Sequence, residues 1–168
     1  MRFKKQFAVL TILLLAVVVA FATPPVGILF NNILSMGVSS DDLDEHVKIK
    51  GDEEGSQDDW RISLSTKGAS DFYIQDIAIA PGGTSGWHTH PGIFVGTVLT
   101  GSIDFYDENC QLRTFTAGQV WTENNKLHAI ANHSTVDARA QFVYLIKHLQ
   151  PRRIDQPAPV CAPSTGIW

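Results

Sequence analysis

The sequence lacks the patterns that mark several common classes of functional site. It has no glycine-rich phosphate loop, no CxxC pair and no recognisable Ser/His/Asp arrangement, so phosphoryl-transfer and nucleophilic chemistry have no support. Basic residues are also few: 13 Lys and Arg against 17 Asp and Glu give a formal net charge of −4. A nucleic-acid partner would require a basic stripe, and the one basic group, at residues 147–153, is interpreted as a solvated strand end.

No apolar run reaches the ~20 residues that a membrane-spanning helix needs. The longest run, residues 7–22, follows a start with three positive charges, MRFKKQ, and stops at the TPP of residues 23–25. The small residues of AFA, 20–22, offer a peptidase site. This layout predicts a signal peptide over residues 1–22 and a secreted or periplasmic protein. The apolar residues 26–30 leave an uncleaved membrane anchor as the alternative.

Cysteine is scarce, with Cys110 and Cys161 as the two copies. In an exported chain an even count is most simply interpreted as one disulfide, here Cys110–Cys161. It would attach the Pro-rich tail, residues 151–168, to the body of the protein. The alternative is a thiolate metal site, which would need further Cys or His partners that the neighbouring sequence does not supply.

Helical periodicity is missing as well, and short β-rich runs separated by turn residues fill most of the chain. About 146 residues follow the expected signal, which fits one domain. Residues 23–45 are expected to be an N-terminal arm, and residues 46–150 an all-β antiparallel barrel. The expected strands cover residues 46–50, 60–65, 72–80, 86–90, 93–100, 102–107, 112–117, 119–122, 127–132 and 138–148.

The stretch GWHTH, residues 86–90, carries two histidines two positions apart. Residues i and i+2 of a strand face the same side, so His88 and His90 point together. If that side faces the barrel interior, two buried imidazoles need hydrogen-bond partners or a metal. Taken alone, the pair is equally consistent with two surface histidines at a strand end.

The spacing around this pair resembles the first motif of the cupin family. Five residues separate Gly82 from His88, and ten residues separate His90 from Gly101. The resemblance implies a jelly-roll barrel in which both histidines hold a metal ion.

A stretch further downstream resembles the second motif of the cupin family. Gly118 is followed by His128 and, after three intervening residues, by Asn132. In this motif a histidine from a later strand completes the metal site, so the resemblance implies a centre formed by His88, His90 and His128. The alternative is a set of buried histidines that has lost its metal.

The chain departs from the cupin pattern where the family places a glutamate ligand, four residues after the second histidine. Phe94 occupies that position, and no acidic residue lies between Gly82 and Ser102. The altered loop of the second motif has Glu123 and Asn125 in place of the family's proline and glycine. Three neutral imidazoles would leave a divalent ion its full +2 charge, which favours an anionic or enolate-forming ligand.

Further pocket residues are expected on the neighbouring strands. Gln75 and Phe94 are candidates for the pocket wall, and Gln75, Asp76 or Glu123 for a fourth ligand. Imidazole suits zinc, iron, copper and nickel, and the sequence does not choose among them. No catalytic residue can be named, because the acids close to the motifs fall in turns or at strand ends.

The sequence therefore predicts an exported metal-binding cupin with one divalent ion and a small anionic or oxygen-rich ligand. It would be a dioxygenase-like or isomerase-like enzyme or, alternatively, a non-catalytic module that binds a metabolite or sugar acid. Nucleic acid is not an expected partner, and a membrane is one only if the N-terminal segment stays attached. A homodimer is left open.

Overall fold

The computed structural model describes residues 21–51 and 59–163, which form β-strands and no helix. Among these residues no helix has the length and apolarity that crossing a membrane requires. The strands are β1 (Val26–Ser39), β2 (Asp44–Ile49), β3 (Trp60–Ser65), β4 (Ser70–Thr84), β5 (His88–Thr89), β6 (Gly92–Thr100), β7 (Ser102–Tyr106), β8 (Leu112–Thr116), β9 (Val120–Glu123), β10 (Ala129–Ala131), β11 (Ala138–Lys147) and β12 (Ile154–Asp155). The expected signal peptide lies outside the described residues except for Phe21 and Ala22, and its cleavage stays a prediction.

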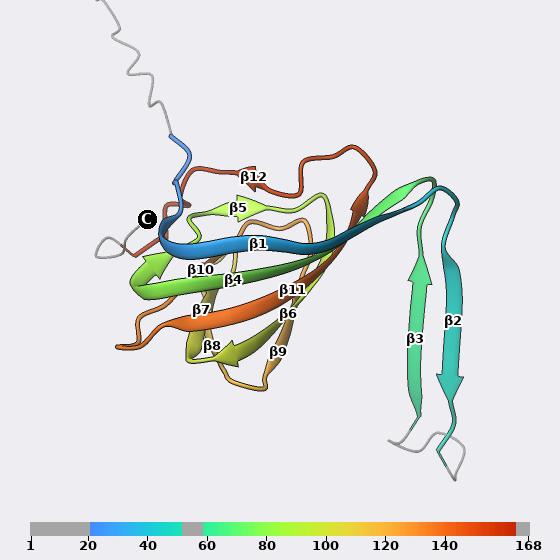
Figure 1. Cartoon of the computed structure of the whole chain (residues 1–168), viewed down its shortest axis with the longest axis horizontal. Coiled ribbons are helices and arrows are strands. Elements are labelled where there is room, and N and C mark those ends of the chain that lie inside the picture. The colour runs from blue at the N-terminus through green and yellow to red at the C-terminus, as the bar shows by residue number, and fades with distance from the viewer. Residues whose placement is uncertain (1–20, 52–58, 164–168) are drawn as a thin grey trace, which may run out of the picture.

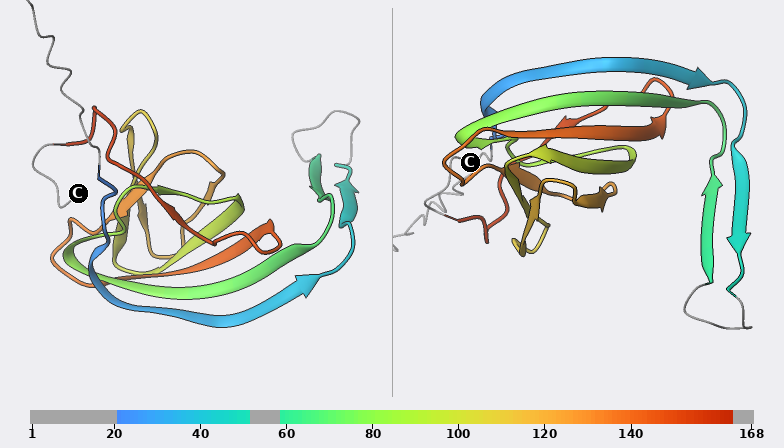
Figure 2. Two further views of the ribbon diagram at one scale, coloured as in Figure 1. Left: turned by 90° about the horizontal axis from the view of Figure 1, so that it is seen from above. Right: turned by 60° about the horizontal axis from the view of Figure 1, so that its bottom comes forward.

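One 8-stranded antiparallel sheet forms the body of the protein (Figure 1). The strand order is β8-β7-β10-β4-β11-β6-β9, with β1 added to β4. The sheet curls into a nearly closed barrel (Figure 2). The prediction of an all-β antiparallel jelly-roll barrel is therefore confirmed, and every expected strand range overlaps an observed strand.

Alternation along the strands produces the barrel core. In β11 the residues at every second position are buried, from Ala138 to Ile146, as a two-residue period predicts for a strand with one face inward. The core also takes Ile77 and Ile79 from β4 and an aromatic group from β6, β9 and β11. Two members of that group, Phe94 and Tyr144, have ring centres 5.2 Å from that of His90.

The residues expected to be an N-terminal arm, 23–45, contain the long strand β1. It spans 14 residues and pairs antiparallel with β4 over almost its whole length. Thr23, just before β1, is buried. Its backbone N–H donates a hydrogen bond to the Gln156 carbonyl, and its hydroxyl accepts one from the backbone N–H of Trp87. This segment is therefore an integral part of the structure around the site.

Strands β2 and β3, which were expected in the barrel, pair with each other in a separate 2-stranded sheet. This hairpin stands away from the barrel (Figures 1 and 2). The cross-strand pairs Val47–Ile62 and Ile49–Trp60 put exposed apolar side chains on one face. The alternating pattern of these strands was correctly interpreted as β, but periodicity says nothing about which sheet a strand joins.

The turn into β5 depends on a glycine. Gly86 has φ +68°, a left-handed conformation that is costly for other residues, and a Cβ there would lie 2.3 Å from the Thr23 carbonyl oxygen. The Gly86 carbonyl in turn accepts a hydrogen bond from His88. Thr23 can therefore approach the turn before His88 this closely only because residue 86 has no side chain.

We expect Gly86→Ala to destabilise the protein more than Gly118→Ala. Gly118 also has a positive φ, +85°, but no atom lies within 4 Å of its Cβ position. Both variants carry the left-handed penalty of about 1–2 kcal/mol, and only Gly86→Ala adds the overlap with Thr23. Urea unfolding of both variants measures the difference, and equal losses would show that the Thr23 contact is easily displaced.

Candidate metal centre

Three histidines meet at one end of the barrel. His88 lies on β5, His90 directly follows it, and His128 directly precedes β10. Paired backbone hydrogen bonds between His88 and His128, 2.9 and 3.0 Å long, hold the two segments side by side. All three side chains are buried, and one ring nitrogen from each lies within 4.8 Å of the other two.

Each imidazole is fixed through its Nδ1 atom by a backbone carbonyl. Nδ1 of His88 contacts the Gly86 oxygen at 2.9 Å, that of His90 the Arg152 oxygen at 2.6 Å, and that of His128 the Lys126 oxygen at 2.8 Å. A carbonyl can only accept a hydrogen bond, so in each ring Nδ1 carries the proton. In the neutral rings Nε2 then presents a lone pair, which is the arrangement of histidines that bind metals.

Burial keeps two of these rings neutral. The pKa of His88 is held well below its ordinary value, first by burial and then by repulsion from His128. The same two causes lower the pKa of His90 to about 3. Because a metal competes with protons for the imidazole nitrogen, rings that stay unprotonated are ready to bind one.

Glu123, at the end of β9, is buried beside the histidines. Its Oε1 accepts a hydrogen bond from Trp121 Nε1 at 2.6 Å. Its Oε2 contacts His128 Nε2 and lies 3.8 Å from His90 Nε2. In the described part of the chain, Glu123 Oε2 and His128 Nε2 have no hydrogen-bond partner apart from this contact with each other. A bound cation would satisfy both buried atoms, so these residues fit a metal ion.

A pocket of about 150 Å³ opens beside the histidines. Apolar side chains form much of its wall, and among them are Phe94 and Tyr144, whose rings are 5.1 Å apart. The polar and charged residues that line it are Asn31, Gln75, Ser85, His88, His90, Glu123, Arg152 and Arg153. The pocket is large enough to hold a small ligand.

The three pocket residues expected from the sequence all line the pocket, namely Gln75, Phe94 and Glu123. Gln75 donates from Nε2 to Asn31 Oδ1, which leaves its buried Oε1 without a partner. Asp76, the other candidate ligand, instead forms two hydrogen bonds with Arg139 and does not line the pocket.

Sequence reasoning missed the two arginines of the pocket wall. Arg152 and Arg153 were interpreted as part of a solvated strand end, and that interpretation is wrong, because both line the pocket and are partly buried. Arg153 donates to the Ser85 carbonyl at 2.6 Å and pairs with Asp155. Burial lowers its pKa, yet a guanidinium stays charged at neutral pH. No local signal indicates that these residues turn back over the site.

The C-terminal segment reaches the site by pairing β12 with β5. Ile154 lies opposite Thr89 and Asp155 opposite His88, and the Gln156 N–H donates to the Trp87 carbonyl at 2.9 Å. This pairing places the Arg152 carbonyl against His90 and the arginine side chains along the pocket. A segment expected to be a tail therefore supplies part of the centre.

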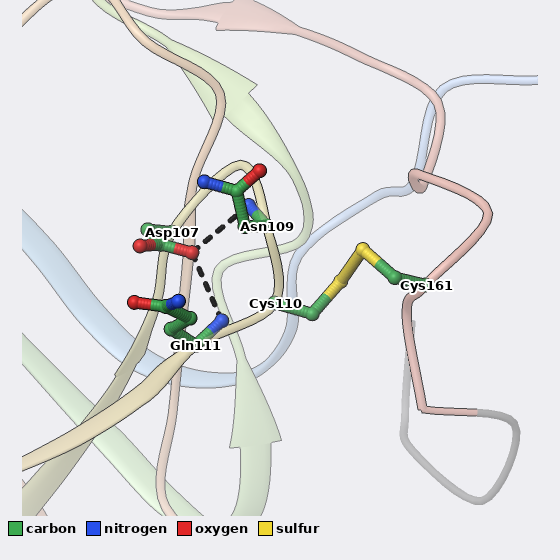
Figure 3. Close-up of a disulfide and its surroundings, with 5 residues drawn as sticks. All are labelled: Asp107, Asn109, Cys110, Gln111 and Cys161. Atoms are coloured by element: carbon green, nitrogen blue, oxygen red, sulfur yellow. Dashed lines mark hydrogen bonds between the residues drawn. A yellow bond between two sulfur atoms is a disulfide. The ribbon is translucent and has the colours of Figure 1, made fainter.

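Beyond β12 the chain is attached to the barrel by a disulfide between Cys110 and Cys161 (Figure 3). Cys110 lies in the turn between β7 and β8, where Asp107 Oδ1 accepts hydrogen bonds from the backbones of Asn109 and Gln111, each 2.9 Å long. The Cα atoms of the two cysteines are 5.9 Å apart. The disulfide therefore joins the end of the tail to a well-ordered turn.

Comparison with protein-family models identifies this barrel. Residues 75–144 match the model Cupin_2, described as a cupin domain, and this range contains His88, His90, Glu123 and His128. The chain therefore carries a cupin domain, as its two motifs indicated. A comparison with curated proteins found no match.

Solved structures similar to part of the chain include two bacterial proteins. The Cupin_2 domain of an XRE family transcriptional regulator from Enterobacter cloacae is 22% identical, with 45% of this chain and 81% of that chain covered and a TM-score of 0.41. A predicted oxalate decarboxylase from Thermotoga maritima is 23% identical, with 48% and 84% covered and a TM-score of 0.41. An oxalate oxidase is 22% identical, with 44% and 41% covered and a TM-score of 0.40.

We expect the metal-free protein to lose stability as the pH falls from about 7 to 5. The folded-state pKa values of His88 and His90 lie below the ordinary value of ~6.5, so below that pH the unfolded chain binds protons that the folded one excludes. Each histidine then removes up to about 1.4 kcal/mol per pH unit. Urea unfolding in the presence of EDTA measures this slope.

His90→Asn should flatten the slope, because one excluded proton is gone. Asp71 and Asp76 also have shifted pKa values, lowered chiefly by His148 and Arg139 respectively, but carboxylates contribute mainly below about pH 4. The window above pH 5 therefore isolates the histidines. A stability that does not change across it would show that the rings accept protons in the folded protein.

We expect loss of the disulfide to weaken the site as well as the fold. Cys110 and Cys161 are 51 residues apart, and opening a loop of this length costs about 4 kcal/mol on the chain-entropy model. The double variant Cys110→Ala/Cys161→Ala should melt lower and bind Zn²⁺ more weakly, because the tail supplies the carbonyl that holds His90. Unchanged Zn²⁺ affinity in a folded variant would show that β12 holds its place without the disulfide.

Proposed function

We propose that this protein is an exported metal-binding cupin whose three histidines hold one divalent ion, with a small carboxylate-containing ligand bound beside it. The observation that carries the proposal is the fixing of all three Nδ1 atoms by backbone carbonyls. Each of those hydrogen bonds directs an Nε2 lone pair toward the same point. Buried histidines with a purely structural role would have no reason to share this orientation.

The charge of the pocket supports an anionic ligand. Arg152 and Arg153 bring two guanidinium groups to the wall of a pocket that is otherwise largely apolar. Arg152 lies over the rings of Tyr73 and Tyr144, with its guanidinium carbon 5.9 and 5.7 Å from their centres, so its position is restricted. A guanidinium pairs well with a carboxylate because its donors match both oxygens.

Other pocket groups would orient such a ligand. Burial raises the pKa of the Tyr144 hydroxyl, so it keeps its proton and can donate a hydrogen bond. The free Oε1 of Gln75 can accept one from a ligand hydroxyl. A bound ion would supply Lewis-acid polarisation of a ligand oxygen. Together these groups suit a small hydroxy acid.

A binding module without turnover is the second candidate. Within residues 21–51 and 59–163, the pocket wall contains one carboxylate, Glu123, and it is engaged by Trp121 and His128. No free general base is therefore evident in this part of the chain. Oxygen-uptake measurements on the metal-loaded protein with hydroxy acids, diketones and phenols decide between turnover and binding.

We expect the protein purified after export to retain one divalent ion per chain, and His128→Ala to retain none while staying folded. Removing one of the three imidazoles should weaken the centre enough for the ion to be lost during purification. Elemental analysis measures the metal content, and His133→Ala is the matched control, because His133 pairs with Asp104 away from the centre. A wild type without metal under metal-replete conditions, or full occupancy in His128→Ala, would contradict the proposal.

The same preparation tests the ligand. Metal-loaded protein should bind glycolate, and bind methyl glycolate far more weakly, because the ester lacks the charge that the arginines recognise. Arg153→Gln should lower the glycolate affinity by roughly 10- to 100-fold, since hydrogen bonds to charged groups contribute about 1.5–3 kcal/mol. Titration calorimetry measures both effects. Equal binding of acid and ester would show that shape rather than charge selects the ligand.

A further inference from the structure

Glu123 stands directly across from the position at which this chain lacks a carboxylate. Strands β6 and β9 pair antiparallel, and in their register Phe94 is the partner of Glu123. Residues opposite each other on such a pair project to the same face of the sheet, with Cβ atoms ~5 Å apart. Both side chains are buried and both line the same pocket. A carboxylate on β9 can therefore reach the space that one at residue 94 would occupy.

Glu123 directs one carboxylate oxygen at two of the three histidines. His128 donates its Nδ1 proton to the Lys126 carbonyl, and its Nε2 contacts Glu123 Oε2. The two buried atoms in contact are stabilised by a positive charge shared between them, either a proton on Nε2 or a metal ion. Oε2 also lies 3.8 Å from His90 Nε2, which is close enough for one ion to contact both atoms.

Trp121 restricts the carboxylate to one orientation. Its indole N–H donates to Oε1, which leaves Oε2 directed at the histidines. This is the way in which outer groups of metal sites orient a ligating carboxylate. Two residues of the same short strand thus act as ligand and support.

We propose that Glu123 is the fourth protein ligand of the metal, so that the carboxylate missing at residue 94 is supplied by the neighbouring strand. This inference rests on the proposed metal centre. The protein ligands would then be three imidazoles and one carboxylate, and the net charge of the centre would be +1 rather than the +2 expected from three histidines alone. Recognition of an anionic ligand would accordingly depend on Arg152 and Arg153 more than on the ion.

Glu123→Gln tests the assignment, because glutamine has the same shape and keeps an oxygen for Trp121 while it removes the charge at Oε2. We expect its Co²⁺ affinity, measured by chelator competition, to fall more than about 100-fold, since even outer-shell partners are worth ~10–100-fold. The absorption bands of bound Co²⁺ should also shift. Glu45→Gln is the matched control, because Glu45 is exposed on β2 in the hairpin that is separate from the barrel, and it should match wild type in both measurements.

The exchange variant Phe94→Glu/Glu123→Gln separates loss of a ligand from structural damage. It restores an acid on the same face from the partner strand and should recover most of the Co²⁺ affinity that Glu123→Gln loses. Thermal unfolding of the metal-free proteins checks that all variants fold. A folded exchange variant that binds Co²⁺ no better than Glu123→Gln would count against ligation from either strand.

The outcomes distinguish this inference from the proposed function. If wild type binds Co²⁺, His128→Ala does not, and Glu123→Gln equals wild type in affinity and spectrum, then the metal centre stands and Glu123 is not a ligand. If wild type itself binds no Co²⁺, the metal centre fails and the inference fails with it. Loss of Co²⁺ affinity in Glu123→Gln, with recovery in the exchange variant, supports both the metal centre and ligation by Glu123.

Discussion

The site depends on three hydrogen bonds from imidazole Nδ1 atoms to backbone carbonyls. They determine which nitrogen of each histidine carries the proton, and therefore which one is left to bind a metal. Two of the carbonyls, those of Gly86 and Lys126, lie two residues before the histidines they hold, so short turns supply them. The third, from Arg152, lies 62 residues away along the chain. The position of His90 therefore requires the C-terminal segment to be in place.

That requirement explains how the C-terminal segment is held. Pairing of β12 with β5, contacts of Gln156 with Thr23 and Trp87, and the Cys110–Cys161 disulfide all hold the same stretch of chain against the barrel. The N-terminal segment takes part too, since Thr23 contacts both Gln156 and Trp87. Both ends of the described chain thus converge on the turn that carries His88 and His90, and Gly86 makes room for them.

The pairing of Phe94 with Glu123 shows how a carboxylate on a neighbouring strand can reach the position of a motif residue. Facing positions on paired strands project to the same face of the sheet, so an acid at either position reaches the same volume. The phenyl ring of Phe94 packs against both His90 and Tyr144, with ring centres 5.2 and 5.1 Å away. It makes the pocket more apolar, which strengthens the interaction of the arginines with an anion.

The sequence by itself determined what depends on local pattern: the strand ranges from β2 to β11, the common face of His88 and His90, and the cupin spacing that pointed to His128. These follow from the two-residue period of a strand and from motif spacing, which need no knowledge of distant partners. Tertiary structure decided what depends on pairing between distant segments. It separated the β2–β3 hairpin from the barrel, joined β1 to β4, brought Arg152 and Arg153 to the pocket and set Glu123 opposite Phe94. Register and the return of a tail arise from contacts between residues far apart in the chain, and no local pattern records them.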